Sequence, residues 1–417
     1  MKIISVVGAR PNFMKVAPFI HSINAYNQNH PNTIKHLLVH TGQHYDDRMS
    51  KSFFDALNIP DADINLGIGS GSHAEQVGLS MIELEKVFIA EKPDWVVVFG
   101  DVNATMAATI SAKKLHIKVC HVEAGLRSGD ITMPEEVNRL VTDRLSDLLL
   151  TPDRLSIENL KAEGASDNRI RFVGNIMIDT LEANREKAGK LSIQSIITNN
   201  QINQPISKSS YQPTCLPKTT VRQVNQSTNL PAFGRTSNHP INQPSALCEF
   251  ALMTLHRPSN VDYKEVLEPL VNFLVDEIAE KLAIVWAVHP RTEKQLKTFD
   301  LWGKVLNSPN IYLVHPLDYH SMLRLNMHAK IMLTDSGGLQ EECTVLGTPC
   351  LTMRWNTERP ITLREHGGAS VLVGNNIQRI REEFNHTLSQ PRKPERPELW
   401  DGHTAERCLE AILKYQE

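Results

Sequence analysis

The strongest constraint on the fold is a series of short, almost wholly apolar runs, each followed by a segment with helical spacing. The run Trp95–Phe99 reads WVVVF and Lys118–Val122 reads KVCHV, and similar runs recur at Phe250–Leu255 and Lys330–Leu333. Strands that are apolar on both faces are typical of parallel sheets covered by helices on each side. A chain of 417 residues is also too long for one ordinary core. The sequence therefore predicts two doubly wound α/β domains, each binding ligands at the carboxyl ends of its strands.

One segment departs from this pattern. Residues 194–246 contain 14 Asn or Gln, 13 Ser or Thr and 6 Pro, and no Asp or Glu. Such a composition buries too little apolar surface to offset the entropy of ordering. We therefore expect a first domain over residues 1–176, a second domain over 177–396 with a flexible Asn/Gln-rich insert at 194–246, and a C-terminal helix over 397–417. A solvated loop is the plainer interpretation of the insert, and a partner-binding segment is the alternative.

Composition excludes several classes of function. The net charge of −3 argues against a nucleic-acid or anionic-membrane partner, and no apolar run approaches the roughly 18 to 20 residues needed to span a bilayer. The six cysteines are scattered without a CxxC pair, which indicates free thiols in a reducing cytoplasm and no zinc site. Neither GxGxxG nor GxxxxGK[ST] occurs, so no nicotinamide cofactor is expected.

Acidic residues follow two neighbouring strands and open the next helix. Asp101 follows WVVVF, Glu123 ends the next apolar run, and Glu135 and Glu136 follow a helix-initiating proline. Parallel topology brings these ends together, and clustered carboxylates raise one another's pKa, which suits general acid/base catalysis. The alternative is that they only complement helix N-termini. That alternative is strong for Glu136 and weak for Glu123, because an unused carboxylate is costly at the end of an apolar strand.

Three further stretches are candidates for ligand binding. Arg10 and Lys15 lie where the first strand gives way to a helix, a common anion site, although both residues also fit a charged surface. His256 directly follows an apolar strand, where a structural histidine and a catalytic one are equally plausible. In LTDSGGLQEE, residues 333–342, the glycines let backbone N–H groups approach a diphosphate, and Glu341 or Glu342 would accept hydrogen bonds from a ribose. A capped helix after a glycine turn is the alternative there.

Eight motifs in this order carry a family resemblance: GARPNFMK, HTGQHYD, GDVNAT, HVEAGLRS, MPEEVNR, TLHRPSN, LTDSGGLQEE and RWNTERP. Together they resemble the non-hydrolysing UDP-N-acetylglucosamine 2-epimerases over nearly the whole chain outside the insert. The resemblance implies two Rossmann-like domains facing a cleft, as in the GT-B glycosyltransferases, and a cytoplasmic homodimer without a nicotinamide cofactor or metal.

The implied reaction interconverts UDP-N-acetylglucosamine and UDP-N-acetylmannosamine through elimination of UDP and its re-addition to 2-acetamidoglucal. A glycosyltransferase or a hydrolysing epimerase acting on a UDP-sugar is the alternative. The acid/base residues implied by the resemblance are Asp101, Glu123 and Glu135, assisted by His256. The residues implied to bind UDP and the sugar are Arg10, Lys15, Ser336, Gly337, Gly338, Glu342 and Arg359.

Two features depart from the family pattern. The insert lies directly upstream of the strand that leads to His256, where it would disturb the cleft. Some family members are activated by a second UDP-N-acetylglucosamine bound to a polar patch, and the stretch GSGSHAEQ at residues 69–76 does not match the activated members. Gln43, which belongs to that patch, is present, so the sequence gives no decision on activation by substrate.

Overall fold

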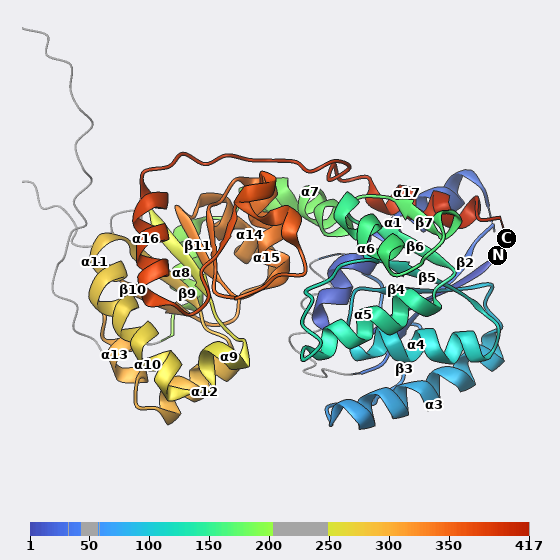
Figure 1. The fold of residues 1–417 in the computed structure, drawn as a ribbon, viewed down its shortest axis with the longest axis horizontal. Coiled ribbons are helices and arrows are strands. Elements are labelled where there is room, and N and C mark those ends of the chain that lie inside the picture. Colours follow the sequence, from blue (N-terminus) through green and yellow to red (C-terminus); the bar gives the residue numbers. More distant parts are fainter. Residues whose placement is uncertain (32, 43–56, 58, 203–248, 417) are drawn as a thin grey trace, which may run out of the picture.

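Two parallel sheets, each covered by helices on both faces, lie next to each other in this chain (Figure 1). The computed structural model describes residues 1–416 except 32, 43–56, 58 and 203–248. The predicted fold class, two Rossmann-like doubly wound domains, is confirmed. The domain boundaries at residues 176 and 396 stay predictions.

The first sheet has seven strands in the order β3-β2-β1-β4-β5-β6-β7. Its strands are β1 (Lys2–Val7), β2 (Lys35–His40), β3 (Ile64–Asn65), β4 (Trp95–Phe99), β5 (Lys118–Val122), β6 (Leu148–Thr151) and β7 (Ile170–Phe172). Its helices are α1 (Arg10–Asn29), α3 (His73–Glu91), α4 (Asn103–Lys114), α5 (Pro134–Leu145) and α6 (Arg154–Ala162), with a 3₁₀ turn at η1 (Asp167–Arg169).

The second sheet has six strands in the order β10-β9-β8-β11-β12-β13. Its strands are β8 (Phe250–Thr254), β9 (Ala283–Ala287), β10 (Ile311–Val314), β11 (Ile331–Thr334), β12 (Cys350–Thr352) and β13 (Ser370–Leu372). Its helices are α9 (Pro258–Val261), α10 (Lys264–Phe273), α11 (Ala279–Lys281), α12 (Pro290–Thr298), α13 (Trp302–Leu306), α14 (Tyr319–His328), α15 (Gly337–Leu346) and α16 (Ile377–Leu388). Shorter helical turns are η2 (Leu274–Ile278), η3 (Pro360–Thr362) and η4 (Arg364–His366).

The apolar strands are continuous because both faces of each sheet are buried. In β4, Trp95, Val97 and Phe99 join the core beneath α1, whereas Val96 and Val98 join the core beneath α3 and α4. The residues of β9 divide in the same way between two cores. This two-sided burial explains why WVVVF contains no alternating polar residue.

Each sheet changes winding direction beside its central strand, and these points position the candidate site. In the first sheet β1 pairs with β2 on one side and with β4 on the other. In the second sheet β8 pairs with β9 and with β11. Ligands of doubly wound sheets bind at the carboxyl ends of strands beside such a switch point, so the turns after β1, β4, β8 and β11 are the relevant ones.

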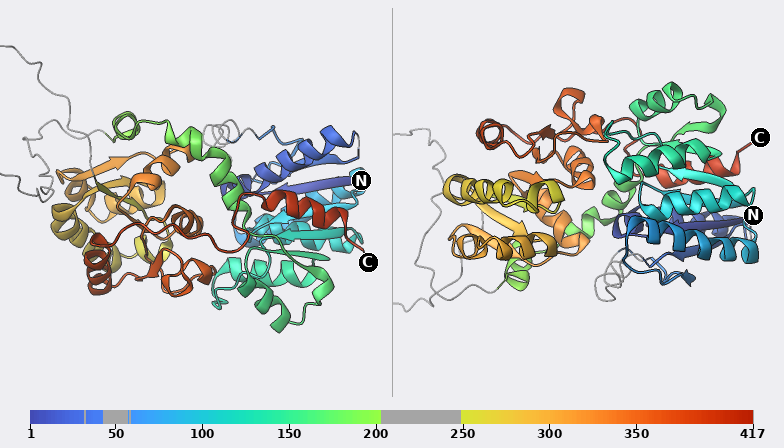
Figure 2. Two further views of the ribbon diagram at one scale, coloured as in Figure 1. Left: turned by 90° about the horizontal axis from the view of Figure 1, so that it is seen from above. Right: turned by 60° about the horizontal axis from the view of Figure 1, so that its bottom comes forward.

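Two stretches of chain connect the domains. Helix α7 (Ile176–Gly189) leads from the first sheet toward the second, and the chain returns after α16 to end in α17 (Thr404–Leu413) on the first domain (Figures 1 and 2). Helix α17 packs against α1 and α7. The indole N–H of the buried Trp400 donates to the carbonyl of Pro152 at 2.9 Å. The C-terminal helix, which the sequence could assign to either domain, therefore belongs to the first domain's core.

The structure differs from the composition argument at the start of the insert. Residues 194–200, which we expected to be flexible, belong to α8 (Ile193–Asn200). The hydroxyl of Ser192 accepts a hydrogen bond from Ser195 N–H at the start of the helix, and Ile196 and Ile197 are buried. The high content of Asn, Gln, Ser and Thr in this segment gives no indication of the short apolar face of α8. The rest of the expected insert, from residue 203 onward, lies outside the described residues.

Among the residues that the structure describes, no helix combines the length and the hydropathy needed to cross a bilayer. Four cysteines in the same part of the chain are buried free thiols: Cys120, Cys343, Cys350 and Cys408.

Candidate active site

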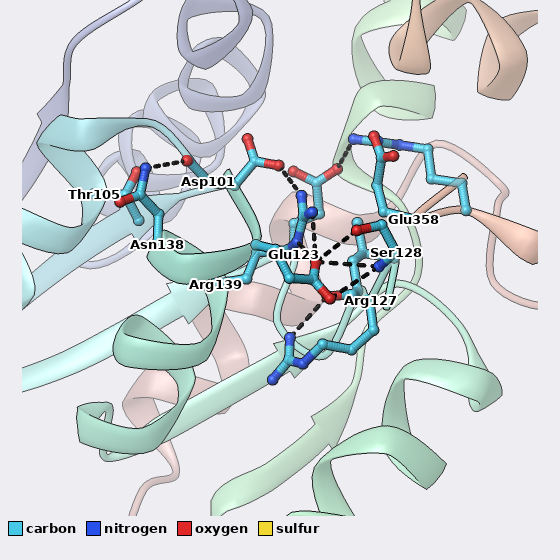
Figure 3. Close-up of polar contacts among 12 residues, drawn as sticks. Asp101, Thr105, Glu123, Arg127, Ser128, Asn138, Arg139 and Glu358 are labelled. Atoms are coloured by element: carbon cyan, nitrogen blue, oxygen red, sulfur yellow. Dashed lines mark hydrogen bonds and ion pairs between the residues drawn. The ribbon is translucent and has the colours of Figure 1, made fainter. Parts of the chain in front are cut away.

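Polar side chains of both domains meet where β4 and β5 end, opposite the start of α15 and the loop after β12 (Figure 3). At the centre lies Glu123, whose carboxylate pairs with Lys15 of α1 and, through Oε1, with Arg359 Nη2 at 2.8 Å. All three side chains are less than one-tenth exposed. Burial opposes ionisation of Glu123, but Lys15 and Arg359 outweigh it and hold its pKa below the ordinary value. The central carboxylate is therefore ionised and bound by one cation from each domain.

Arg359 also binds two acids of its own domain. Its Nε donates to Glu341 Oε1 at 2.8 Å, and its Nη1 pairs with Glu358. The same Glu341 oxygen accepts from Asn175 Nδ2, at the start of α7, at 2.8 Å. Burial raises the pKa of Glu341, although Arg359 opposes the shift. Arg359 thus links carboxylates of both domains in one buried network.

Gly337 allows this network to lie close to the first turn of α15. A Cβ added at Gly337 would lie 2.8 Å from Arg359 Nη1 and 2.8 Å from Glu358 Oε1. Such contacts are too short for a real side chain, so any larger residue would displace Arg359. Ser336 precedes the helix as its N-cap residue, and the nearest neighbour of a Cβ at Gly338 would be Met177 at 3.7 Å.

Asp101 and Glu135 lie at the edge of the same region. The half-buried Asp101 pairs with Arg139 of α5. Arg139 also pairs with Glu136, which in addition accepts hydrogen bonds from the backbone of Ser128 at 3.1 Å. Glu136 therefore supports the loop after β5, in agreement with its interpretation as a structural acid. Glu135 is half-buried, and its charge acts on Arg257 of the second domain.

His256 and Asp335 form a pair at the end of the second sheet. The Nδ1 atom of His256 lies 2.8 Å from Asp335 Oδ1. Asp335 also accepts from the backbone N–H groups of His256 and Arg257, at 3.0 and 2.8 Å through Oδ2. Burial opposes ionisation of Asp335, but its hydrogen bonds to His256 and Arg257 hold its pKa below the ordinary value. A carboxylate that accepts Nδ1–H leaves Nε2 of His256 available to a ligand.

The predicted residue Glu342 stands apart from the central network. It contacts Tyr319 and Asn326 of α14, whereas the neighbouring Glu341 contacts Arg359. Arg10 begins α1, five residues before Lys15, and its side chain is outside the described part of the structure. Four residues of the site were not predicted from the sequence: Glu358, Arg139, Asn175 and Asp335. Three of them, Glu358, Arg139 and Asp335, lie inside quoted motifs, but nothing in their local sequence distinguishes them from capping or surface residues.

Among the described residues, no group of three or more His, Cys, Asp or Glu side chains is arranged to hold a metal ion. The site consists of ion pairs between carboxylates and cations that two domains contribute. The fold and this interface define a GT-B-like protein of two Rossmann-like domains.

Comparison with known proteins identifies the family. The family model described as UDP-N-acetylglucosamine 2-epimerase matches residues 27–211 and 219–413. The chain is 38% identical over 417 residues to a UDP-N-acetylglucosamine 2-epimerase of Methanocaldococcus jannaschii, covering 100% of this chain and 99% of the relative. It is 32% identical over 418 residues to a UDP-2,3-diacetamido-2,3-dideoxy-D-glucuronate 2-epimerase of Pseudomonas aeruginosa, covering 99% and 100%.

A solved structure agrees with these sequence matches. The crystal structure of the M. jannaschii UDP-GlcNAc 2-epimerase, in complex with UDP-GlcNAc and UDP, superposes with a TM-score of 0.81 at 37% identity and covers all of both chains. The chain therefore belongs to the UDP-N-acetylglucosamine 2-epimerase family.

The environment of Glu342 generates a pH prediction. Burial raises its pKa from 4.5 to about 7, although Tyr319 and Asn326 oppose the shift. Between these two pH values Glu342 is ionised in the unfolded chain but still protonated in the folded chain. Ionisation therefore stabilises the unfolded chain, and the free energy of unfolding falls as the pH rises. Glu342→Gln removes this loss, which amounts to about 2 kcal/mol between pH 5 and pH 8. Urea unfolding at both pH values should show the variant gaining stability relative to the unmodified chain at pH 8. Glu83→Gln, at a more exposed acid of α3, is the control; a pH-independent difference for Glu342→Gln would contradict the prediction.

Proposed function

We propose that this chain interconverts UDP-N-acetylglucosamine and UDP-N-acetylmannosamine without hydrolysis. The observation that carries the proposal is the buried carboxylate Glu123, bound by Lys15 of one domain and Arg359 of the other. Cations that bind a buried carboxylate are also suited to bind a leaving diphosphate, and the freed carboxylate is suited to move a proton. The M. jannaschii relative, by its description, binds UDP-GlcNAc and UDP.

The proposed chemistry is an elimination followed by an addition. The C2–H and C1–O bonds break, the C1=C2 double bond of 2-acetamidoglucal forms, a carboxylate takes the C2 proton, and UDP leaves with the C1–O electron pair. Re-addition of UDP at C1, with a proton delivered to C2 from the opposite face, gives the epimer. Because the proton leaves C2 from one face of the sugar ring and returns from the other, acid/base groups are needed on both sides of the ring. We assign this work to Asp101, Glu123 and Glu135, with His256 near the diphosphate.

Diphosphate binding would also change the acid/base properties of Glu123. Its pKa is low because Lys15 and Arg359 outweigh its burial. A carboxylate held by two cations is a weak base. When the diphosphate draws Lys15 and Arg359 away, burial dominates and the pKa of Glu123 rises. Substrate binding would therefore prepare the base only when the leaving group is in place.

The nucleotide contacts are assigned to the start of α15. Ser336, Gly337 and Gly338 present the N-terminus of a ten-residue helix, where backbone N–H groups favour an anion. Arg10 remains proposed as a further cation for UDP, beside Lys15 and Arg359. For the ribose, Glu342 remains our assignment; it is buried, and its Oε2 accepts no hydrogen bond from the described residues. No cofactor is required by this route, because no carbon is oxidised.

The proposal also includes a cytoplasmic homodimer. Helix α3 exposes Leu79, Ile82 and Ile89, each more than two-fifths exposed in the single chain. Contiguous exposed apolar side chains are typical of protein interfaces. Light scattering should give about twice the mass of one chain, and a monomer at micromolar concentration would contradict this part of the proposal.

Incubation with UDP-N-acetylglucosamine in deuterated water tests the function. The proposed epimerase gives UDP-N-acetylmannosamine with deuterium at C2, read by NMR. A hydrolysing epimerase gives free sugar and UDP, and a transferase gives no epimer without an acceptor. UDP-2,3-diacetamido-2,3-dideoxy-D-glucuronate, the substrate class of the P. aeruginosa relative's name, should be run in parallel. Turnover of that substrate alone would replace the proposed substrate but retain the reaction.

Substitution of the proposed acid/base residues gives a second test. Asp101→Asn, Glu123→Gln and Glu135→Gln should each lower kcat by at least about 10²-fold, the usual contribution of general acid/base catalysis. Glu91→Gln, at an acid of the same domain that pairs with Lys2 at the amino end of β1, should keep kcat within about twofold. Near-normal turnover in one of the three variants would remove that residue from the assignment.

A further inference from the structure

The turn that carries Asp101 is held by an unusual number of side chains. Three consecutive carbonyl oxygens, from Phe99 to Asp101, each accept a hydrogen bond from a side chain outside the turn (Figure 3 draws part of this set). The donors are Asn12 Nδ2 at 2.8 Å and Thr105 Oγ1 at 2.9 Å to Phe99, His121 Nε2 at 2.9 Å to Gly100, and Asn138 Nδ2 at 2.8 Å to Asp101. The backbone before Asp101 is therefore fixed from several elements at once.

Among these donors, His121 also contacts Asp143 through its other ring nitrogen. Its ring is fully buried in β5, its Nε2 faces the carbonyl of Gly100, and its Nδ1 lies 2.6 Å from Asp143 Oδ1. Both partners are oxygens that only accept. Each ring nitrogen of His121 therefore faces an acceptor oxygen on a different element. The ring therefore acts as a rigid bridge from α5 to the turn after β4.

The second carboxylate oxygen of Asp143 contacts the turn that contains Glu123 and Gly125. Oδ2 accepts from Gly125 N–H at 3.0 Å and from Arg127 Nη1 at 2.7 Å. This turn is strained at Glu123, a non-glycine residue with a φ of 78°. A non-glycine residue in the left-handed region persists only where its surroundings hold it. Asp143 thus restrains the backbone two residues after Glu123.

We propose that His121 and Asp143 form a positioning pair that holds the Asp101 and Glu123 turns in register for the reaction. The pair acts through two backbone groups, the carbonyl of Gly100 and the amide of Gly125. The inference rests on the proposed function, because it assigns importance to the placement of these two acids.

Two substitutions of His121 separate the contacts. The amide nitrogen of Gln reaches about the position of Nε2 and keeps the donor to Gly100, whereas that of Asn reaches about the position of Nδ1 and loses it. His121→Asn should therefore lower kcat about 10-fold or more, since small misplacements of reacting groups are costly. His121→Gln should retain kcat within about threefold. UDP affinity, measured by calorimetry, should change less than twofold in both variants. Calorimetry also gives the fraction of protein that binds UDP, and kcat is calculated from that fraction.

Hydrogen exchange supplies a readout that needs no activity. Amides of residues 99–105 should exchange faster in His121→Asn than in His121→Gln or the unmodified chain. The matched control is His36→Gln, at a half-buried histidine of the same sheet whose Nε2 lies 2.9 Å from Ser5 Oγ. It should lower stability but leave kcat and this exchange unchanged. Asp143→Asn keeps only one of the two acceptor oxygens, so it loses the contact with His121 Nδ1 or the one with Gly125 N–H. It should lower kcat as His121→Asn does.

Three results would overturn the proposal: equal kcat in the Asn and Gln variants, a kcat loss in the His36 control that matches its loss of stability, or absence of UDP-binding sites in all His121 and Asp143 variants. The last result would mean that the pair holds the fold rather than the turns. Failure of the proposed function is distinguishable, because then the unmodified chain itself gives no epimer while hydrogen exchange still reports on the turn.

Discussion

The ion pair between Glu123 and Arg359 is the interaction on which the rest of the site depends. It joins the end of β5 in one domain to the loop after β12 in the other, and Lys15 completes it. Burying one of these charges without its partner would cost several kcal/mol. Arg359 in turn binds Glu341 and Glu358. The relation between the domains and the ionisation of the central acid therefore depend on the same contacts.

These contacts follow from sheet topology. Lys15 lies in the helix after β1, Asp101 follows β4 and Glu123 follows β5, and these three strands are neighbours in the first sheet. In the second sheet β8 and β11 are neighbours, so His256 and Asp335 meet at their ends. The backbone around Asp101 and Glu123 is fixed in two ways. Glu123 has a left-handed backbone conformation, and the carbonyls of Phe99–Asp101 accept hydrogen bonds from side chains. The parallel fold therefore creates the site, and the buried polar side chains refine it.

Much of the fold follows from sequence because two-sided burial leaves a clear pattern. Runs such as WVVVF and the acids directly after them indicate parallel strands and a polar edge, and the quoted motifs indicate the family. The apolar pattern does not reveal the short helix α8, because its few apolar residues lie within a polar segment. Which acid of the pair Glu341 and Glu342 reaches Arg359 depends on how α15 is rotated against α14, and adjacent letters carry no signal of that rotation. Asn175 meets Glu341 across 166 positions of sequence, a contact that only tertiary packing determines.

Under the proposed function, Glu123 and the UDP diphosphate compete for Lys15 and Arg359. Calorimetric titration of UDP into the unmodified chain and into Glu123→Gln tests this competition directly, with Glu91→Gln as the control. Removing the competing carboxylate should tighten UDP binding about tenfold, equivalent to about 1.4 kcal/mol, although the same change abolishes most turnover. Unchanged or weaker UDP binding in Glu123→Gln would contradict the claim.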